Sequence, residues 1–134
     1  MNTKVINLRM KKKAVQIVKN LVEEKWFFEQ LEKKKRILLQ QTFVELQQIY
    51  NVSGNLIIKH LPEGRSCYCK KNFIISLNKT SLLEFLHEFR HLLQDKKPGI
   101  CPVGEYELDA ELWVGRLLFQ VGVKEEVYRK ERKI

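Results

Sequence analysis

Residues 81–91 read SLLEFLHEFRH, and this stretch decides the local fold and the chemistry expected of the chain. Ser81 followed by Glu84 has the spacing of a capping box, in which a serine side chain accepts a hydrogen bond from the first turn of a helix. The apolar residues that follow recur every three or four positions, as on one face of an amphipathic helix. We therefore expect a helix that begins after Ser81 and ends at about Gln94.

This helix carries an H-E-x-x-H motif, formed by His87, Glu88 and His91. Two histidines four residues apart lie one turn above each other on a helix, so both rings can bind one metal ion. Glu88 then points toward the same ion and can take a proton from a water molecule bound to it. The motif predicts two metal ligands and a general base. Arg90 is expected to lie away from the metal and to pair with an acidic group.

A catalytic zinc site has three protein ligands and an open position for water. The metzincin arrangement would need glycine at position 94 and histidine at position 97, but Gln94 and Lys97 stand there and exclude it. The best remaining source is the acidic run at residues 105–111, which opens a predicted helix reaching about Gln120. The third ligand is therefore expected to be a carboxylate.

Within this run, Glu107 and Glu111 are four residues apart and share a helix face. We prefer Glu107 as the third ligand, with Glu111 accepting a hydrogen bond from a ligating imidazole. Glu105 with Asp109 is the same arrangement shifted by two residues and stays open as an alternative. One or two of these acids could instead serve only to complement the helix dipole.

The rest of the chain predicts an α+β fold. Residues 1–53 contain no proline or glycine and show helix-like apolar spacing, so we expect one or two long helices with a bend near residues 23–25. A short opening strand around residues 6–10 is a further expectation, and residues 51–54 supply the helix stop. Three short β-type segments follow, and the last two form a predicted hairpin in a small three-stranded antiparallel sheet; the segments are residues 55–60, 65–69 and 72–77.

The 134 residues suggest one domain with a single core. No apolar run reaches 18 residues and no long apolar segment follows the N-terminus, so we expect neither a transmembrane helix nor a signal peptide, and a cytoplasmic location. The three cysteines form no C-x-x-C pair, which argues against a disulfide framework or a cysteine-based zinc site; they are Cys67, Cys69 and Cys101.

The net charge of +9 is concentrated near the N-terminus, where residues 1–36 hold 11 Lys/Arg against 4 Glu. We divide the domain into this basic helical segment, a catalytic core of about residues 37–122 and a basic tail, 123–134. The basic runs 11–13 and 33–36 could contact nucleic acid or an anionic membrane surface, although a solvated helix face is the simpler interpretation. No recognisable nucleic-acid-binding motif accompanies them.

The H-E-x-x-H motif followed by ELDAELW at residues 107–113 resembles the gluzincin zinc metallopeptidases, whose glutamate helix carries the pattern E-x-x-A-[DE]. The segment NFIISLN at residues 72–78, shortly before the motif helix, is similar to that of ImmA/IrrE-type peptidases. The order of helix, three strands and two helices also resembles the minimal archaeal minigluzincins. The resemblance covers roughly residues 35–120.

The resemblance implies a zincin-like minimal metalloprotease that hydrolyses peptide bonds in a protein or peptide substrate. One Zn²⁺ per chain would be bound by His87, His91 and Glu107, with Glu88 as general base on the zinc-activated water. Tyr68 and His60 are weak candidates for a further oxyanion donor, although His60 is more simply an ordinary strand histidine. The C-terminal tail could fill the cleft, as in minigluzincins, or lie exposed.

A second interpretation belongs to a different class of protein. The chain could be a non-catalytic, zinc-containing binding module whose basic N-terminal helix engages nucleic acid or an acidic protein. Glu88 argues against this interpretation, because a purely structural metal site has no use for a general base.

Overall fold

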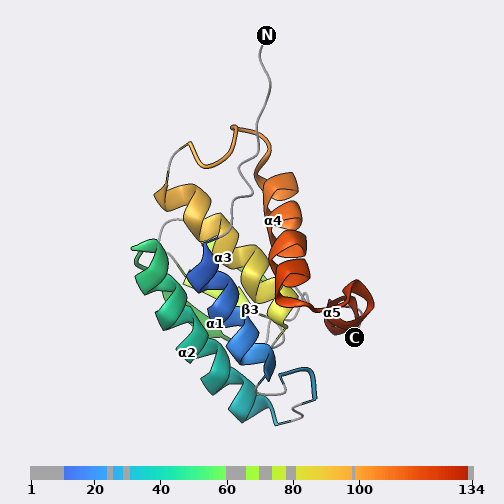
Figure 1. The fold of residues 1–134 in the computed structure, drawn as a ribbon. Helices are drawn as coiled ribbons and strands as arrows, with labels where there is room; N and C mark the ends of the chain where they lie inside the picture. The colour runs from blue at the N-terminus through green and yellow to red at the C-terminus, as the bar shows by residue number, and fades with distance from the viewer. Residues whose placement is uncertain are drawn as a thin grey trace.

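The computed structural model describes residues 11–23, 26–28, 31–59, 66–69, 74–77, 81–97 and 99–132. Helices and short strands both occur in these ranges, which confirms the α+β class (Figure 1). The elements are α1 (Lys12–Glu23), η1 (Trp26–Phe28), α2 (Glu32–Tyr50), β1 (Asn55–Ile58), β2 (Cys67–Cys69), β3 (Ile74–Leu77), α3 (Leu82–Lys96), α4 (Tyr106–Val121) and α5 (Glu125–Arg132). None of these helices is both long and apolar enough to cross a membrane.

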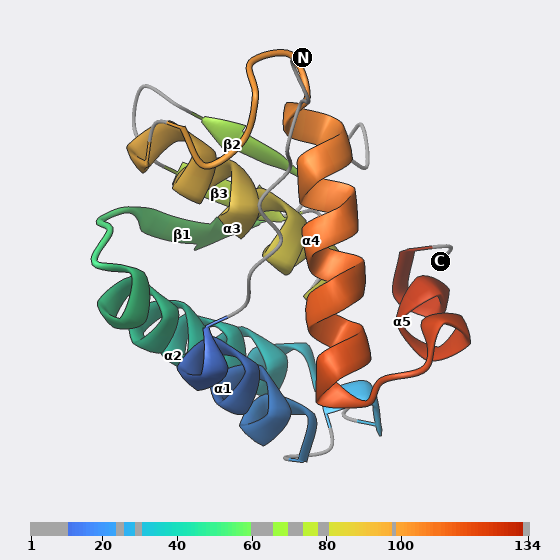
Figure 2. The same cartoon turned by 45° about the horizontal axis from the view of Figure 1, so that its top comes forward.

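The N-terminal half contains two helices, and the expected bend near residues 23–25 is a break between them. The first helix, α1, ends at Glu23, and the second, α2, begins at Glu32 and packs beside it (Figure 2). Trp26 in the intervening 3-10 turn is fully buried, so the break lets the chain fold an aromatic residue into the core. The opening strand expected around residues 6–10 lies outside the described residues.

The end of α2 agrees with the predicted stop. Asn51 adopts a left-handed conformation, with φ of 54°, and its backbone N–H bonds to the carbonyl groups of Gln47 and Gln48. Asparagine tolerates this conformation better than most residues, so it ends a helix in the way that glycine usually does.

The three strands form one sheet in the order β1-β3-β2. The second strand pairs antiparallel with β3, as a hairpin requires, with Tyr68 opposite Ile75. The first strand pairs parallel with β3, with Leu56 opposite Ile75, so the prediction of an entirely antiparallel sheet is wrong. Short apolar segments fit either direction of pairing, and only the long-range path of the chain decides between them.

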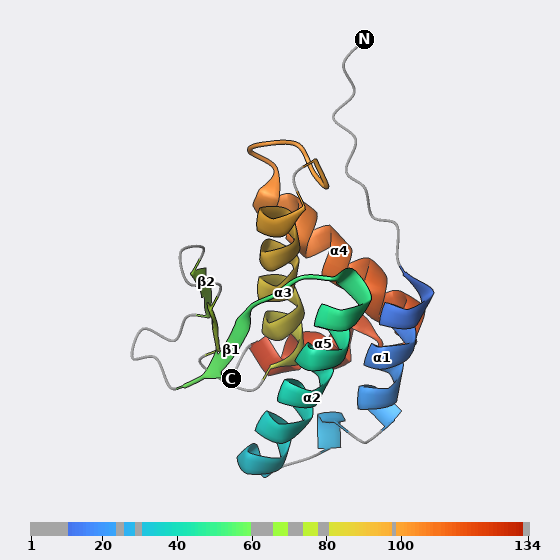
Figure 3. The ribbon, with the colours of Figure 1, turned by 90° about the vertical axis from the view of Figure 1, so that its left-hand side faces the viewer.

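The motif helix α3 is the centre of the fold, with the sheet on one side and α4 on the other (Figure 3). It begins as predicted, because the Ser81 hydroxyl accepts a hydrogen bond from the Glu84 N–H at 3.2 Å, and it ends at Lys96, two residues beyond the expected Gln94. The Glu84 carboxylate accepts a hydrogen bond from the Ser66 hydroxyl at 2.9 Å, which ties the helix start to the segment before β2.

Aromatic side chains hold α3 from several directions. Phe89 is fully buried, packs edge-on against Phe43 of α2 at a centroid distance of 6.0 Å, and stacks on Trp113 of α4 at 6.5 Å. The buried apolar residues form one cluster, which extends from Ala14 on α1 to Tyr128 on α5. One face of α3 is thereby fixed in the core, and the opposite face is left to line a cleft.

Candidate metal centre

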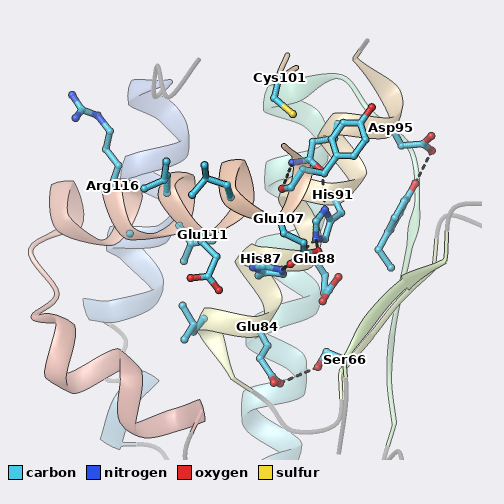
Figure 4. A pocket seen from close by; sticks show the side chains of 18 of the residues that line it. Ser66, Glu84, His87, Glu88, His91, Asp95, Cys101, Glu107, Glu111 and Arg116 are labelled. Atoms are coloured by element: carbon cyan, nitrogen blue, oxygen red, sulfur yellow. Dashed lines mark hydrogen bonds and ion pairs between the residues drawn. The ribbon is translucent and has the colours of Figure 1, made fainter. Parts of the chain in front are cut away.

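Two imidazole rings and one carboxylate meet at the exposed face of α3. The Nε2 atoms of His87 and His91 are 3.2 Å apart, and the two carboxylate oxygens of Glu107 lie 3.1 Å from His87 Nε2 and 2.8 Å from His91 Nε2. Figure 4 shows the three side chains pointing toward one another. Among the described residues, these three form the group whose ligand atoms could hold a metal ion.

The third member of this group reaches the histidines from the first turn of α4. A turn containing Gly104, with φ of +89°, precedes this helix, and the Asp109 N–H bonds to the Glu105 carbonyl at 2.8 Å as the helix begins. Glu107 then lies opposite the motif, with its side chain 77% exposed, while the two histidine side chains are each 14% exposed. The candidate centre thus has a protein-covered side and a side open to the cleft.

Asp109, which belonged to the alternative ligand pair, lies elsewhere. Its carboxylate accepts two hydrogen bonds from the Arg90 guanidinium, from Nε at 2.7 Å and from the terminal nitrogen at 3.0 Å. Both side chains are buried. The expectation that Arg90 points away from the metal and pairs with an acid is confirmed, and the structure brings Glu107, and not Asp109, to the histidines.

Glu88, the candidate general base, is 8% exposed and lines the same cleft as His87 and His91. Its carboxylate lies beside the two imidazoles in Figure 4. A carboxylate beside a metal-binding group can act as a general base when it lies within hydrogen-bond reach of a water molecule bound there.

The protonation state of His87 favours metal binding. Burial lowers the pKa of its imidazole and the neighbouring His91 lowers it further, whereas the carboxylates of Glu107 and Glu111 act in the opposite direction. The net effect is a lowered pKa, so the ring is neutral near pH 7 and keeps a lone pair for a metal ion. Glu111 therefore acts on His87 through its charge.

The imidazole of His91 is held by a residue that the sequence analysis did not assign. Its Nδ1 lies 2.7 Å from the Gln94 side-chain oxygen. Glu111 was the predicted partner of a ligating imidazole, but for His91 that partner is Gln94. The one local signal was its position three residues after His91, which places the two side chains on the same face of the helix.

The cleft beside these residues has a volume of about 1760 Å³ and is bounded by α3, α4, α5 and the segment that contains β2. Although the chain is basic overall, six acidic side chains and one arginine occur among the described lining residues: Glu84, Glu88, Asp95, Glu107, Glu111, Glu125 and Arg116. Apolar side chains from α4 and the loop before it complete the wall, including Val103, Leu108 and Leu112. The cleft is therefore acidic with an apolar side.

The sequence also led to predictions for a further oxyanion donor, Tyr68 or His60, and for the C-terminal tail. The Tyr68 hydroxyl donates a hydrogen bond to Asp95 at 2.8 Å, and burial together with that carboxylate raises the pKa of Tyr68, so the hydroxyl is already engaged. His60 lies outside the described residues. The described part of the tail forms α5, whose buried Tyr128 joins the core; Tyr128 and the exposed Glu125 both line the cleft.

The chain matches no family model, no curated protein and no solved structure, so a functional assignment has to be argued from these side chains themselves.

Proposed function

We propose that this protein is a zinc-dependent metallopeptidase of the gluzincin type, with a zincin-like fold. In this proposal His87, His91 and Glu107 bind one Zn²⁺, and Glu88 is the general base. The observation that supports it most directly is the convergence of three ligand groups in the wall of an open cleft, beside a buried glutamate.

The donor set fits zinc. Two imidazole nitrogens with one carboxylate, and a fourth position left for water, is a common composition of catalytic zinc sites. Four ligands at about 2.0–2.1 Å in tetrahedral geometry lie roughly 3.3 Å from one another. The separations between ligand atoms of 2.8–3.2 Å are close to this spacing, so small side-chain adjustments suffice to accept the ion.

Zinc bound there would polarise a scissile carbonyl group and lower the pKa of a water molecule. The Glu88 carboxylate is placed to accept a proton from the attacking water and to return it to the leaving nitrogen. The second strand, β2, is an outer strand of the described sheet and borders the cleft, so an extended peptide could add to its outer edge by backbone hydrogen bonds.

The acidic cleft predicts a preference for basic substrates. Besides Glu107 and Glu88, four further carboxylates line the cleft, and their negative charge would attract lysine or arginine side chains near the scissile bond. For matched peptides with lysine or glutamate at these positions, we expect kcat/KM to favour lysine by about tenfold at low ionic strength. The preference should shrink at high salt, where the Debye length falls to about 3 Å at 1 M.

A suitable control for this preference is Glu125→Gln on α5, which removes one negative charge from the wall. The variant should hydrolyse a neutral peptide at the wild-type rate and discriminate less between the two charged peptides. Equal rates on both charged peptides in the wild type, or a preference insensitive to salt, would contradict the electrostatic explanation.

The proposed function is tested by measuring bound zinc per chain in the wild type, in Glu107→Ala and in the matched control Glu105→Ala. We expect about one zinc in the wild type and in the control, with clearly less in Glu107→Ala. Loss of zinc in Glu105→Ala alone would move the third ligand to that residue. A wild-type protein that takes up no zinc after reconstitution would overturn the proposal.

The alternative, a non-catalytic zinc-containing binding module, rests on the basic N-terminal helices. Lysines at positions 12, 13, 19, 33 and 34 are exposed, which a nucleic-acid or acidic-protein partner would need. Other lysines are engaged in the fold, because Lys35 lies over the Trp26 ring at 4.9 Å and Lys11 donates to the Ile49 carbonyl at 3.1 Å. A salt-sensitive affinity for DNA without hydrolysis of any peptide would favour this second function.

A further inference from the structure

We propose that Gln94 is a positioning residue that fixes the tautomer and the orientation of His91, and that the buried Arg90–Asp109 pair holds Gln94 in place. This inference rests on the proposed function, since it assigns how one of its ligands is prepared to bind a metal. It concerns a chain of hydrogen bonds from the core to the cleft.

Gln94 makes three side-chain hydrogen bonds at short distances. Its side-chain nitrogen lies 2.8 Å from the Tyr106 carbonyl oxygen and 2.7 Å from Asp109 Oδ2, and its oxygen lies 2.7 Å from His91 Nδ1. A carboxamide has two N–H donors, and both are directed at groups that can only accept. The orientation of the amide is therefore determined, because a flipped amide would place its oxygen against two other acceptors.

The fixed amide determines the state of the imidazole. Because the Gln94 oxygen can only accept, His91 Nδ1 must carry a hydrogen and donate it. In the neutral ring, the lone pair then resides on Nε2, the atom that lies 2.8 Å from Glu107 and 3.2 Å from His87 Nε2. Gln94 thus selects the tautomer that can bind a metal ion at this centre, and it holds the ring plane in the direction required.

Gln94 is itself held by a buried ion pair. Asp109 Oδ2 accepts from both Gln94 and Arg90 Nε, and the two charged side chains are 0% and 2% exposed. The guanidinium also lies over the Trp113 ring, with its carbon 5.3 Å from the ring centroid. Neither charged group can rotate into solvent, so the acceptor that faces Gln94 is stationary.

The arrangement differs from a direct contact between carboxylate and imidazole. A ligating histidine commonly donates to a carboxylate, a backbone carbonyl or water. Here a neutral amide stands between the imidazole and the carboxylate, and the charge of Asp109 is compensated by Arg90. The partner of Nδ1 is therefore a neutral oxygen and not a carboxylate. Gln94 would thus affect the metal affinity of His91 by orienting the ring and not by adding negative charge.

The test compares zinc affinity in the wild type, in Gln94→Met and in Gln94→Glu, with Gln41→Met on the exposed face of α2 as the matched control. Gln94→Met keeps the size of the side chain and removes all three hydrogen bonds, so we expect a 10- to 100-fold loss of affinity in competition with a chelator. Gln94→Glu keeps an acceptor for His91 Nδ1 but places a carboxylate oxygen against the Tyr106 carbonyl and Asp109, so we expect it too to bind zinc less tightly than the wild type. Gln41→Met should bind zinc like the wild type.

A second readout separates this inference from the proposed function. In metal-free Glu107→Ala, where no carboxylate faces Nε2, the ¹⁵N chemical shifts of the neutral His91 ring report its tautomer; we expect the Nδ1–H form there and a mixture when Gln94→Met is added. Thermal unfolding shows whether each variant is folded. A wild-type protein that binds no zinc would contradict the peptidase proposal, yet the tautomer would still test the role of Gln94. An Nε2–H ring in Glu107→Ala, or unchanged zinc affinity in Gln94→Met, would overturn the inference.

Discussion

Replacing Glu88 by glutamine is expected to lower kcat/KM for peptide hydrolysis by about 10²–10⁴-fold, the usual contribution of a positioned general base. Glutamine has nearly the same shape as glutamate but cannot accept a proton from water at neutral pH. Because the side chain is only 8% exposed, bulk water cannot easily replace it in this role. Zinc content should stay at the wild-type value, since Glu88 is not one of the three grouped ligands.

The matched control is Glu45→Gln, the same chemical change on the exposed face of α2. It should leave the hydrolysis rate unchanged. The measurement is a progress curve with a fluorogenic peptide, alongside zinc analysis of the same samples. Wild-type activity in Glu88→Gln at full zinc occupancy would mean that hydrolysis uses a different base or comes from a contaminating peptidase.

Replacing Asp109 by alanine is expected to lower the free energy of unfolding by about 3–5 kcal/mol, because it removes the buried carboxylate that accepts two hydrogen bonds from the Arg90 guanidinium. Arg90 is 2% exposed and its contact with the Trp113 face supplies no anion. The loss is large against the total stability of about 5–15 kcal/mol that is usual for a domain. Urea unfolding of the metal-free protein, followed by circular dichroism, measures it.

Two comparisons give this measurement its meaning. Glu107→Ala removes an acid two residues away that is 77% exposed, and its effect on metal-free stability should stay within about 0.5 kcal/mol. The double variant Arg90→Met with Asp109→Leu replaces the buried pair by apolar groups and should recover much of the loss. A loss below about 1 kcal/mol in Asp109→Ala would contradict this prediction.

The parts of the fold that could be predicted depend on local interactions. The capping bond from Ser81 to the Glu84 N–H and the apolar spacing of α3 act within one or two turns, so the sequence was sufficient to place this helix. The same holds for the left-handed stop at Asn51. The two histidines come together for the same local reason, since they lie four residues apart on one helix.

The parts that could not be predicted depend on how distant segments dock. Whether β1 runs parallel to β3 is decided by contacts between strands that are not consecutive in the chain. The role of Gln94 depends on the first turn of α4, which presents the Tyr106 carbonyl and Asp109 together. The sequence favoured Glu107 and left the pair Glu105 and Asp109 open, and only the structure shows that Asp109 is instead the partner of the buried Arg90.

The position of Glu107 on α4 has a mechanical consequence. A metal ion held by both α3 and α4 would tether residues 91 and 107 and so close a loop of the chain, as a disulfide does, with an entropic stabilisation that grows slowly with loop length. The start of α4 would then be clamped by the same ion that carries out the chemistry. Removal of the ion would let the first turn of α4, which lines the cleft, open locally. The protein would then lose its catalytic metal and the shape of its substrate site together.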